Sequence, residues 1–212
     1  DSPPLPGCRS LRQLPPMFLP FVLGLTSQGR VWDSAAMADF VPRLIGDIIR
    51  VTLAIVGTLG LLLYALKAVW LPCTVWKETR ASSPAMATGA MALAIIANEA
   101  GQMVNLVLGQ VLWALALALQ FLVAARFLYN MGVQLAVQGP RHTLEDPMYV
   151  SPVHCVPIIG FGVESSMCKF LGPVIEAIGL GLFWHGVACV FLMLPVHTWM
   201  LYRYQLPADM VG

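Results

Sequence analysis

The stretch "LIGDIIRVTLAIVGTLGLLLYALKAVW", residues 44–70, decides the fold class of this chain. A helix that crosses a bilayer needs about 20 predominantly apolar residues, and this run is longer than that. Trp70 and Lys67 close the run, and Trp76 and Lys77 follow it; aromatic and basic side chains together are typical of a membrane interface. We therefore expect a transmembrane helix here.

The composition of the whole chain agrees with this expectation. Of its 212 residues, 58% are hydrophobic and only 11% are charged, with a mean hydropathy of +0.75. Soluble domains carry about 25% charged residues, so this chain has too little polar surface to cover a globule in water. Its net charge of +1 provides no basic surface for nucleic acid. We predict an all-α, polytopic integral membrane protein that contacts membrane lipids and no nucleic acid.

Five more apolar runs complete a predicted bundle of about six membrane segments, built as helical hairpins. The first run is short and broken by Pro20 and Gly24, whereas the next is rich in Ala and Gly, which lets helices approach closely in lipid. A turn is expected at the polar patch around Gly101, and hydrophilic connections at 77–84 and 130–146. The five runs are residues 16–28, 84–98, 106–129, 148–166 and 173–203.

These segments define a membrane domain over residues 16–206, preceded by a proline-rich lead-in (1–15) and followed by a short tail (207–212). Basic residues favour the cytoplasmic side of a membrane protein. With six spans, both termini lie on the side that receives eight of the twelve Lys and Arg residues, which is cytoplasmic, or stromal or matrix in an organelle. The other side receives Arg30, Arg43, Arg50 and Lys169.

The segment "MYVSPVHCVPIIGFGVESS" (148–166) is too rich in proline for an ordinary buried helix. We expect Pro152 and Pro157 each to remove a helical hydrogen bond, and Gly160 and Gly162 to allow bending or close packing. Freed backbone groups in a membrane need partners inside a bundle or beside a wet cavity, and transporters build substrate sites from such broken helices. A kinked helix without a ligand explains the same residues.

The order of these segments resembles the tellurite-resistance/dicarboxylate transporter family, which includes malate carriers and the slow anion channels of guard cells. The resemblance lies in 148–166, in "IGLGLFWHGVACVFLMLPVHTWMLYR" (178–203) with its Phe-Trp and Leu-Pro pairs, and in "PPMFLPFVLGLTSQGRVW" (15–32), which is similar to the family's broken first helix. It covers about residues 14–206 as a pattern of apolar, Pro and Gly positions, without a signature motif.

The resemblance implies a fold of ten helices, in which five hairpins surround a pore lined by the odd-numbered helices. This chain supplies at most six, and the family's gating phenylalanine lies on the ninth, so no residue here inherits that role. Other membrane subunits or further copies of the chain are therefore expected to complete the bundle.

Two functions follow as hypotheses. In the first, the chain passes small anions or dicarboxylates through a pore. In the second, it is a non-transporting structural subunit of a large photosynthetic or respiratory membrane complex in an organelle, in contact with pigments or lipids. The residues expected to line a pore are Pro152, Pro157, Gly160, Gly162, Asn98, Gln102 and Lys169, the last as an attractor of anions at its mouth.

Catalytic chemistry finds no support in the sequence. No nucleophile–base array, metal-ligand spacing or phosphate-binding loop occurs, so we expect neither an enzyme nor a metal, and no cofactor in the main hypothesis. His185, beside Trp184 and Gly186, is the candidate for single axial ligation of chlorophyll or haem in the alternative. A histidine that donates a hydrogen bond to a neighbouring helix is the simpler explanation and is favoured over ligation. The five cysteines read as small hydrophobic residues.

Several ionisable residues fall near the membrane interior. Such residues are functional candidates by default, but most lie within a turn of a predicted span end, which favours interfacial positions. They are Asp47, Glu99, Glu164, Lys169 and Glu176.

Overall fold

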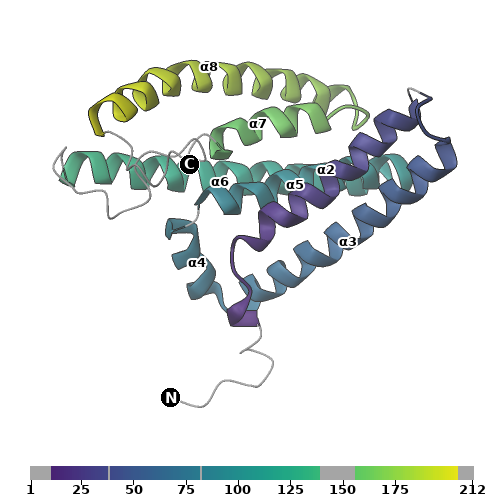
Figure 1. The fold of residues 1–212 in the computed structure, drawn as a ribbon, viewed down its shortest axis with the longest axis horizontal. Helices are drawn as coiled ribbons and strands as arrows, with labels where there is room; N and C mark the ends of the chain where they lie inside the picture. Colours follow the sequence, from purple (N-terminus) through teal and green to yellow (C-terminus); the bar gives the residue numbers. More distant parts are fainter. Residues whose placement is uncertain (1–10, 38, 82, 139–155, 205–212) are drawn as a thin grey trace, which may run out of the picture.

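The computed structural model describes residues 11–37, 39–81, 83–138 and 156–204, and this part of the chain consists of helices joined by short turns, without strands. Six helices form three consecutive antiparallel hairpins, and a short one bridges the first two (Figure 1). The hairpins pair α2 (Phe18–Met37) with α3 (Arg43–Trp70), α5 (Ser83–Met103) with α6 (Leu106–Gln138), and α7 (Val156–Met167) with α8 (Pro173–Tyr204), while α4 spans Pro72–Ala81.

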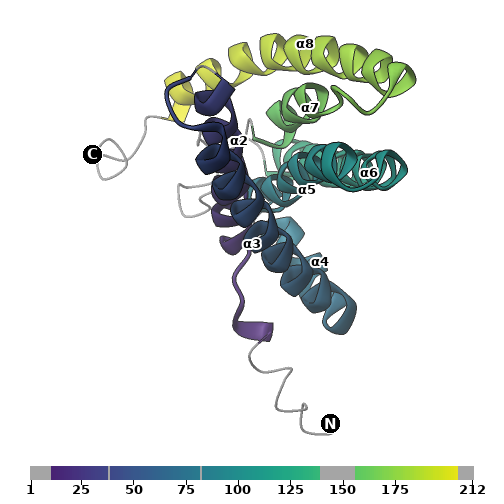
Figure 2. The same cartoon turned by 90° about the vertical axis from the view of Figure 1, so that its right-hand side faces the viewer.

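Each hairpin joins a shorter helix to a longer one. The shorter helices have 20, 21 and 12 residues, and their longer partners have 28, 33 and 32. The middle short helix, α5, packs against both α2 and α7, so the three short helices form an arc with α5 at its centre. Seen from the side, the three hairpins fan out from this arc (Figure 2).

Three helices are long and apolar enough to cross a membrane. They are α3, the Leu106–Asn130 part of α6 and the Pro173–Pro195 part of α8. Because most of their side chains stay exposed in the isolated chain, their apolar surface has to meet lipid or other membrane helices. The helices therefore support the membrane class, and three of the predicted spans are long and apolar enough to cross a bilayer. The predicted count of about six membrane segments is not confirmed, because only these three of the described helices meet the length and hydropathy of a membrane span.

Several predicted boundaries were wrong. The turn expected at Gly101 lies later, because α5 continues to Met103. Gly101 fits inside the helix because it packs closely on Gly109 of α6 and Leu171, so its missing side chain serves packing and not a turn. The hydrophilic connection at 77–84 is in part helix α4. The connection predicted to begin at residue 130 is helical as far as Gln138.

The proline segment is only partly described. Pro152 lies outside the described residues, whereas Pro157 stands in the first turn of α7. A proline there breaks no helical hydrogen bond, since the first amides of a helix have no partner within it. The described half of this segment is accordingly a regular helix.

The core consists mainly of small residues. Along α5 the alanines at 87, 90, 92, 94 and 97 are buried, and Gly109 of α6 lies so close that an added Cβ would stand 2.5 Å from the Gly101 Cα. Small side chains allow this approach of two helix backbones. Larger residues fill the space toward α7 and α8, including Trp113, Phe161, Leu171 and Leu182.

Candidate functional site

A cluster of five charged side chains joins α2, α3 and α5 near one end of the bundle. Arg30 Nη1 donates to Glu99 Oε1 at 2.9 Å, and Arg50 Nη1 donates to Asp33 Oδ1 at 2.8 Å. Arg50 Nε also lies 3.4 Å from Glu99 Oε2, and Asp47 completes the group at 3.7 Å from Arg50. Glu99 is only 5% exposed. Each charge therefore has an opposite partner, as a charge withdrawn from water requires.

A second ion pair lies at the opposite end of α3. Lys67 is fully buried, and its Nζ donates to Glu78 Oε1 of α4 at 2.5 Å and to the Leu14 carbonyl at 2.6 Å. The Tyr64 hydroxyl donates to the other oxygen of Glu78 at 2.7 Å. These bonds attach α4 and the segment before α2 to the end of α3, so Lys67 is a structural cation here and is not free to bind an anion.

Asn98 and Gln102, two of the predicted pore-lining residues, join α5 to the connection between α7 and α8. The Asn98 amide donates to the carbonyls of Met167 (2.8 Å) and Lys169 (2.6 Å), and Gln102 Nε2 donates to Asn98 Oδ1. Asn98 is completely buried, whereas Gln102 is exposed. Asn105 lies in the turn between α5 and α6 and caps α6 through the amides of residues 107 and 108.

Lys169 lies in the same connection and is exposed. Its Nζ stands 5.3 Å from the centre of the Phe170 ring, and in the part of the chain that the structure describes it pairs with no carboxylate. The Phe170 amide donates to Glu176 Oε1 at the start of α8. The charge of Lys169, in the connection between α7 and α8, is therefore available to a ligand.

The contact between α6 and α7 is organised by Gln120, Trp113 and two of the predicted pore-lining residues. Gln120 Nε2 donates to the Pro157 carbonyl at 2.5 Å, and Trp113 Nε1 donates to the Glu164 carbonyl at 3.0 Å. Gly160 faces the Gln120 amide so closely that any Cβ would overlap it. Gln120 and Pro157 are both buried, so this face of α7 is in contact with protein.

Gly162 lies on a different face of α7. A Cβ added there would meet no heavy atom within 4 Å, and the residue lines an apolar groove of about 290 Å³ between α7 and α8. The other lining residues are Ile159, Phe183, Gly186, Val187, Val190 and Phe191. The groove contains no charged side chain, so it suits an apolar chain or ring.

Glu164 departs from the interfacial position that the sequence favoured. Its side chain is fully buried, and among the described residues neither carboxylate oxygen has a hydrogen-bond partner. The oxygen of the Gln120 amide is also buried without a partner. Two unpartnered acceptors in one contact between helices require an explanation.

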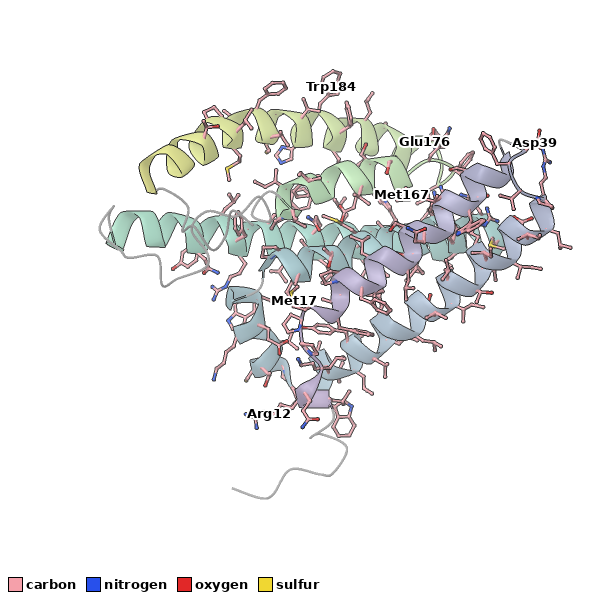
Figure 3. All side chains as sticks on the ribbon, viewed as in Figure 1. Arg12, Met17, Asp39, Met167, Glu176 and Trp184 are labelled. Carbon is pink, nitrogen blue, oxygen red and sulfur yellow. The ribbon has the colours of Figure 1, made fainter. Side chains whose placement is uncertain are left out.

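His185, the candidate pigment or haem ligand, is exposed on α8. Its ring meets the Phe161 ring edge-on, with centroids 5.4 Å apart, and lies 3.6 Å from Cys189 Sγ. Trp184 projects outward from the bundle beside it (Figure 3). The described residues contain no group of three or more His, Cys, Asp or Glu side chains that could hold a metal ion. Axial ligation by His185 stays a prediction.

Comparison with protein families, with characterised proteins and with solved structures gave no match for this chain.

The polar side chains that the sequence reasoning missed were those with distant partners. Arg30 and Glu99 are 69 residues apart, and Gln120 and Pro157 are 37 apart, so neither pair is visible in a local pattern. One signal was available: Trp113 and Gln120 are seven residues apart in an otherwise apolar run, which places them on one face of a helix.

Proposed function

We propose that this chain is a helical module of a membrane transporter or channel that passes small anions or dicarboxylates. The observation that supports the proposal most is the arrangement of three consecutive hairpins, whose shorter helices α2, α5 and α7 lie side by side in an arc while the long apolar helices lie outside them. In the family that the sequence resembles, alternate helices line the pore, and the same alternate helices are the inner ones here.

The proposal includes six membrane crossings. The polar ends of α2, α5 and α7 are joined to neighbours by bonds within the bundle, as with Arg30 and Glu99 or Asn98 and Lys169, so helices too short or too polar to stand alone in lipid cross beside longer partners. Both termini lie on the cytoplasmic, stromal or matrix side in this arrangement. The arc is open in the isolated chain, so further membrane helices or further copies complete the wall.

An anion needs a positive charge at the entrance, and Lys169 supplies an exposed one on the side opposite the termini. We expect Lys169→Gln to lower anion uptake by the purified protein in liposomes several-fold at low ionic strength, because an exposed charge attracts a ligand through long-range forces that salt screens. Lys77→Gln, an exposed lysine of α4 at the other end, is the matched control. Equal uptake by both variants and the unmodified chain contradicts the proposed role of Lys169.

Glycines of α7 and α8 allow a test of the wall itself. Neither Gly162 nor Gly181 has a heavy atom within 4 Å of an added Cβ, so a side chain can begin at either position without a clash. We expect Gly162→Leu to reduce anion uptake and Gly181→Leu, on the exposed face of α8, to leave it unchanged. Anion uptake that survives Gly162→Leu counts against a wall formed by α7.

A structural subunit of a membrane complex is the second candidate. It is favoured by the burial of Asn98, Pro157 and Gly160 in contacts between helices and by the exposed aromatic side chains of α8, including Phe183, Trp184 and Phe191. Mild-detergent native electrophoresis with mass spectrometry separates the two. Bands of this chain alone, or with other transporter helices, support transport; bands that contain energy-transducing subunits support the structural role.

A further inference from the structure

The junction of α5, α6 and α7 contains a buried carboxyl group, that of Glu164, for which the proposed transport function has no role. Glu164 is fully buried on the face of α7 that also carries Pro157, Gly160 and Phe161. Small and apolar side chains dominate the neighbouring surface, including Ala94, Ala97, Ala116 and Trp113. A charged carboxylate without partners is highly unfavourable in such surroundings, and groups of this kind usually become neutral instead.

Titratable and charged groups on the elements packed against α7 do not offset that cost. Glu99 of α5 is paired with arginines, Arg126 of α6 lies over the Trp76 ring, and His185 of α8 meets Phe161. Glu176 accepts a bond from a backbone amide, Lys169 lies over a ring, and the Cys168 thiol donates to the Ser165 carbonyl. Cys189 of α8 lies beside His185, and Tyr129 of α6 lies beside Arg126. None of these forms an ion pair or a hydrogen bond with the Glu164 carboxylate in the described structure.

Gln120 provides the hydrogen-bond acceptor that a neutral carboxylic acid needs. Its amide covers the backbone at Gly160, one helical turn before Glu164, and residues four apart lie on the same face of a helix. Side chains on a helix lean toward its N-terminus, so the Glu164 side chain leans toward the turn that Gln120 covers. The Gln120 amide nitrogen is occupied by the Pro157 carbonyl, which leaves its oxygen as a buried acceptor without a donor.

We propose that Glu164 is a proton-binding site within the bundle, where the carboxyl group holds a proton and presents it to the Gln120 amide oxygen. The proton supplies the single donor that this pair of acceptors lacks. A metal cation fits less well, because hard cations take six or more oxygen ligands and the site offers one carboxylate and one amide oxygen. The inference does not depend on the proposed transport function.

Infrared spectroscopy of the purified protein in detergent or liposomes tests the site without any transport assay. A protonated carboxylic acid has a carbonyl stretch distinct from that of a carboxylate. We expect this band at neutral pH, where ordinary carboxyl groups are ionised, its disappearance at alkaline pH, and its loss at neutral pH in Glu164→Gln, which keeps the size of the side chain. Glu99→Gln is the matched control and should retain the band.

Gln120→Leu gives an independent readout if Glu164→Gln fails to fold. Without its acceptor, the carbonyl band of Glu164 should shift to the higher frequency of an acid that donates no hydrogen bond. Absence of the band at neutral pH in the unmodified protein, its persistence in Glu164→Gln, or an unshifted band in Gln120→Leu would each overturn the proposal.

Discussion

Two buried regions of this bundle each contain a glutamate, and the surroundings of the two carboxyl groups differ: one is paired with arginines and the other has no partner. At the end of α2, α3 and α5, Glu99 lies within 2.9 Å of Arg30 and 3.4 Å of Arg50. At the junction of α5, α6 and α7, Glu164 is equally hidden but meets no cation and no donor in the described structure. The first region is held by charge and the second by close packing around a neutral polar contact, so the same residue type has different chemistry in each.

Removal of one arginine should lower the free energy of unfolding more than any other change considered. Arg50→Leu leaves Glu99 and Asp33 with less compensation in a poorly solvated place, and breaking a buried ion pair costs about 3–5 kcal/mol; because Arg50 is 14% exposed, we expect the lower end of this range. Equilibrium unfolding in mixed micelles measures the loss. Arg43→Leu is the control, since Arg43 begins the same helix and is exposed. Equal losses in both variants would show that the cluster does not hold the helices together.

Adding a methyl group at the closely packed contact of α6 with α7 should lower the free energy of unfolding by an intermediate amount. A Cβ at Gly160 overlaps the Gln120 amide, so Gly160→Ala has to displace Gln120 from the Pro157 carbonyl, and overpacking of this kind costs about 1–3 kcal/mol. Gly162→Ala, two residues later on the same helix, meets nothing within 4 Å and should leave the free energy of unfolding nearly unchanged. A similar response to both substitutions would contradict the close contact of α6 with α7.

Neutral replacement of Glu164 should produce the smallest effect. Because Glu164→Gln replaces a neutral acid by a neutral amide of similar shape, we expect the free energy of unfolding at neutral pH to change by less than about 1 kcal/mol, the typical effect of a single hydrogen bond. Glu99→Gln should cost more, since it leaves Arg30 and Arg50 without their carboxylate. Unfolding of both variants under the same conditions measures the difference, and the reverse order would remove the distinction between the two regions.

The sequence predicted the parts of the fold that depend on local composition. The runs 44–70 and 173–203 correspond closely to the long apolar helices α3 and α8, and the run 106–129 to the first part of α6, because an unbroken apolar run of that length has few alternatives to a membrane helix. The turn wrongly predicted at Gly101 also came from local composition. A glycine beside polar residues looks like a turn locally, whereas its actual role depends on the Gly109 backbone that packs against it.

The candidate site depended on information that no local pattern contains. The partners of Glu99 come from α2 and α3, and nothing near residue 99 or residue 164 distinguishes a paired glutamate from an unpaired one. Of the residues predicted to line a pore, Asn98, Pro157 and Gly160 are in helix contacts, Gly162 lines the apolar groove, and Gln102 and Lys169 are exposed. Their role in transport stays a prediction, to be decided by the uptake measurements on Gly162 and Lys169.

The pH dependence of thermal unfolding, compared between the unmodified chain and Glu164→Gln, tests the contrast between the two regions most directly. Ionisation of an unpaired buried carboxyl group is possible in the unfolded chain but unfavourable in the folded one, so folded-state stability is lost as the pH rises. We predict that the melting temperature of the unmodified protein falls between mildly acidic and alkaline pH by more than that of Glu164→Gln. Parallel curves for the two proteins would contradict the account.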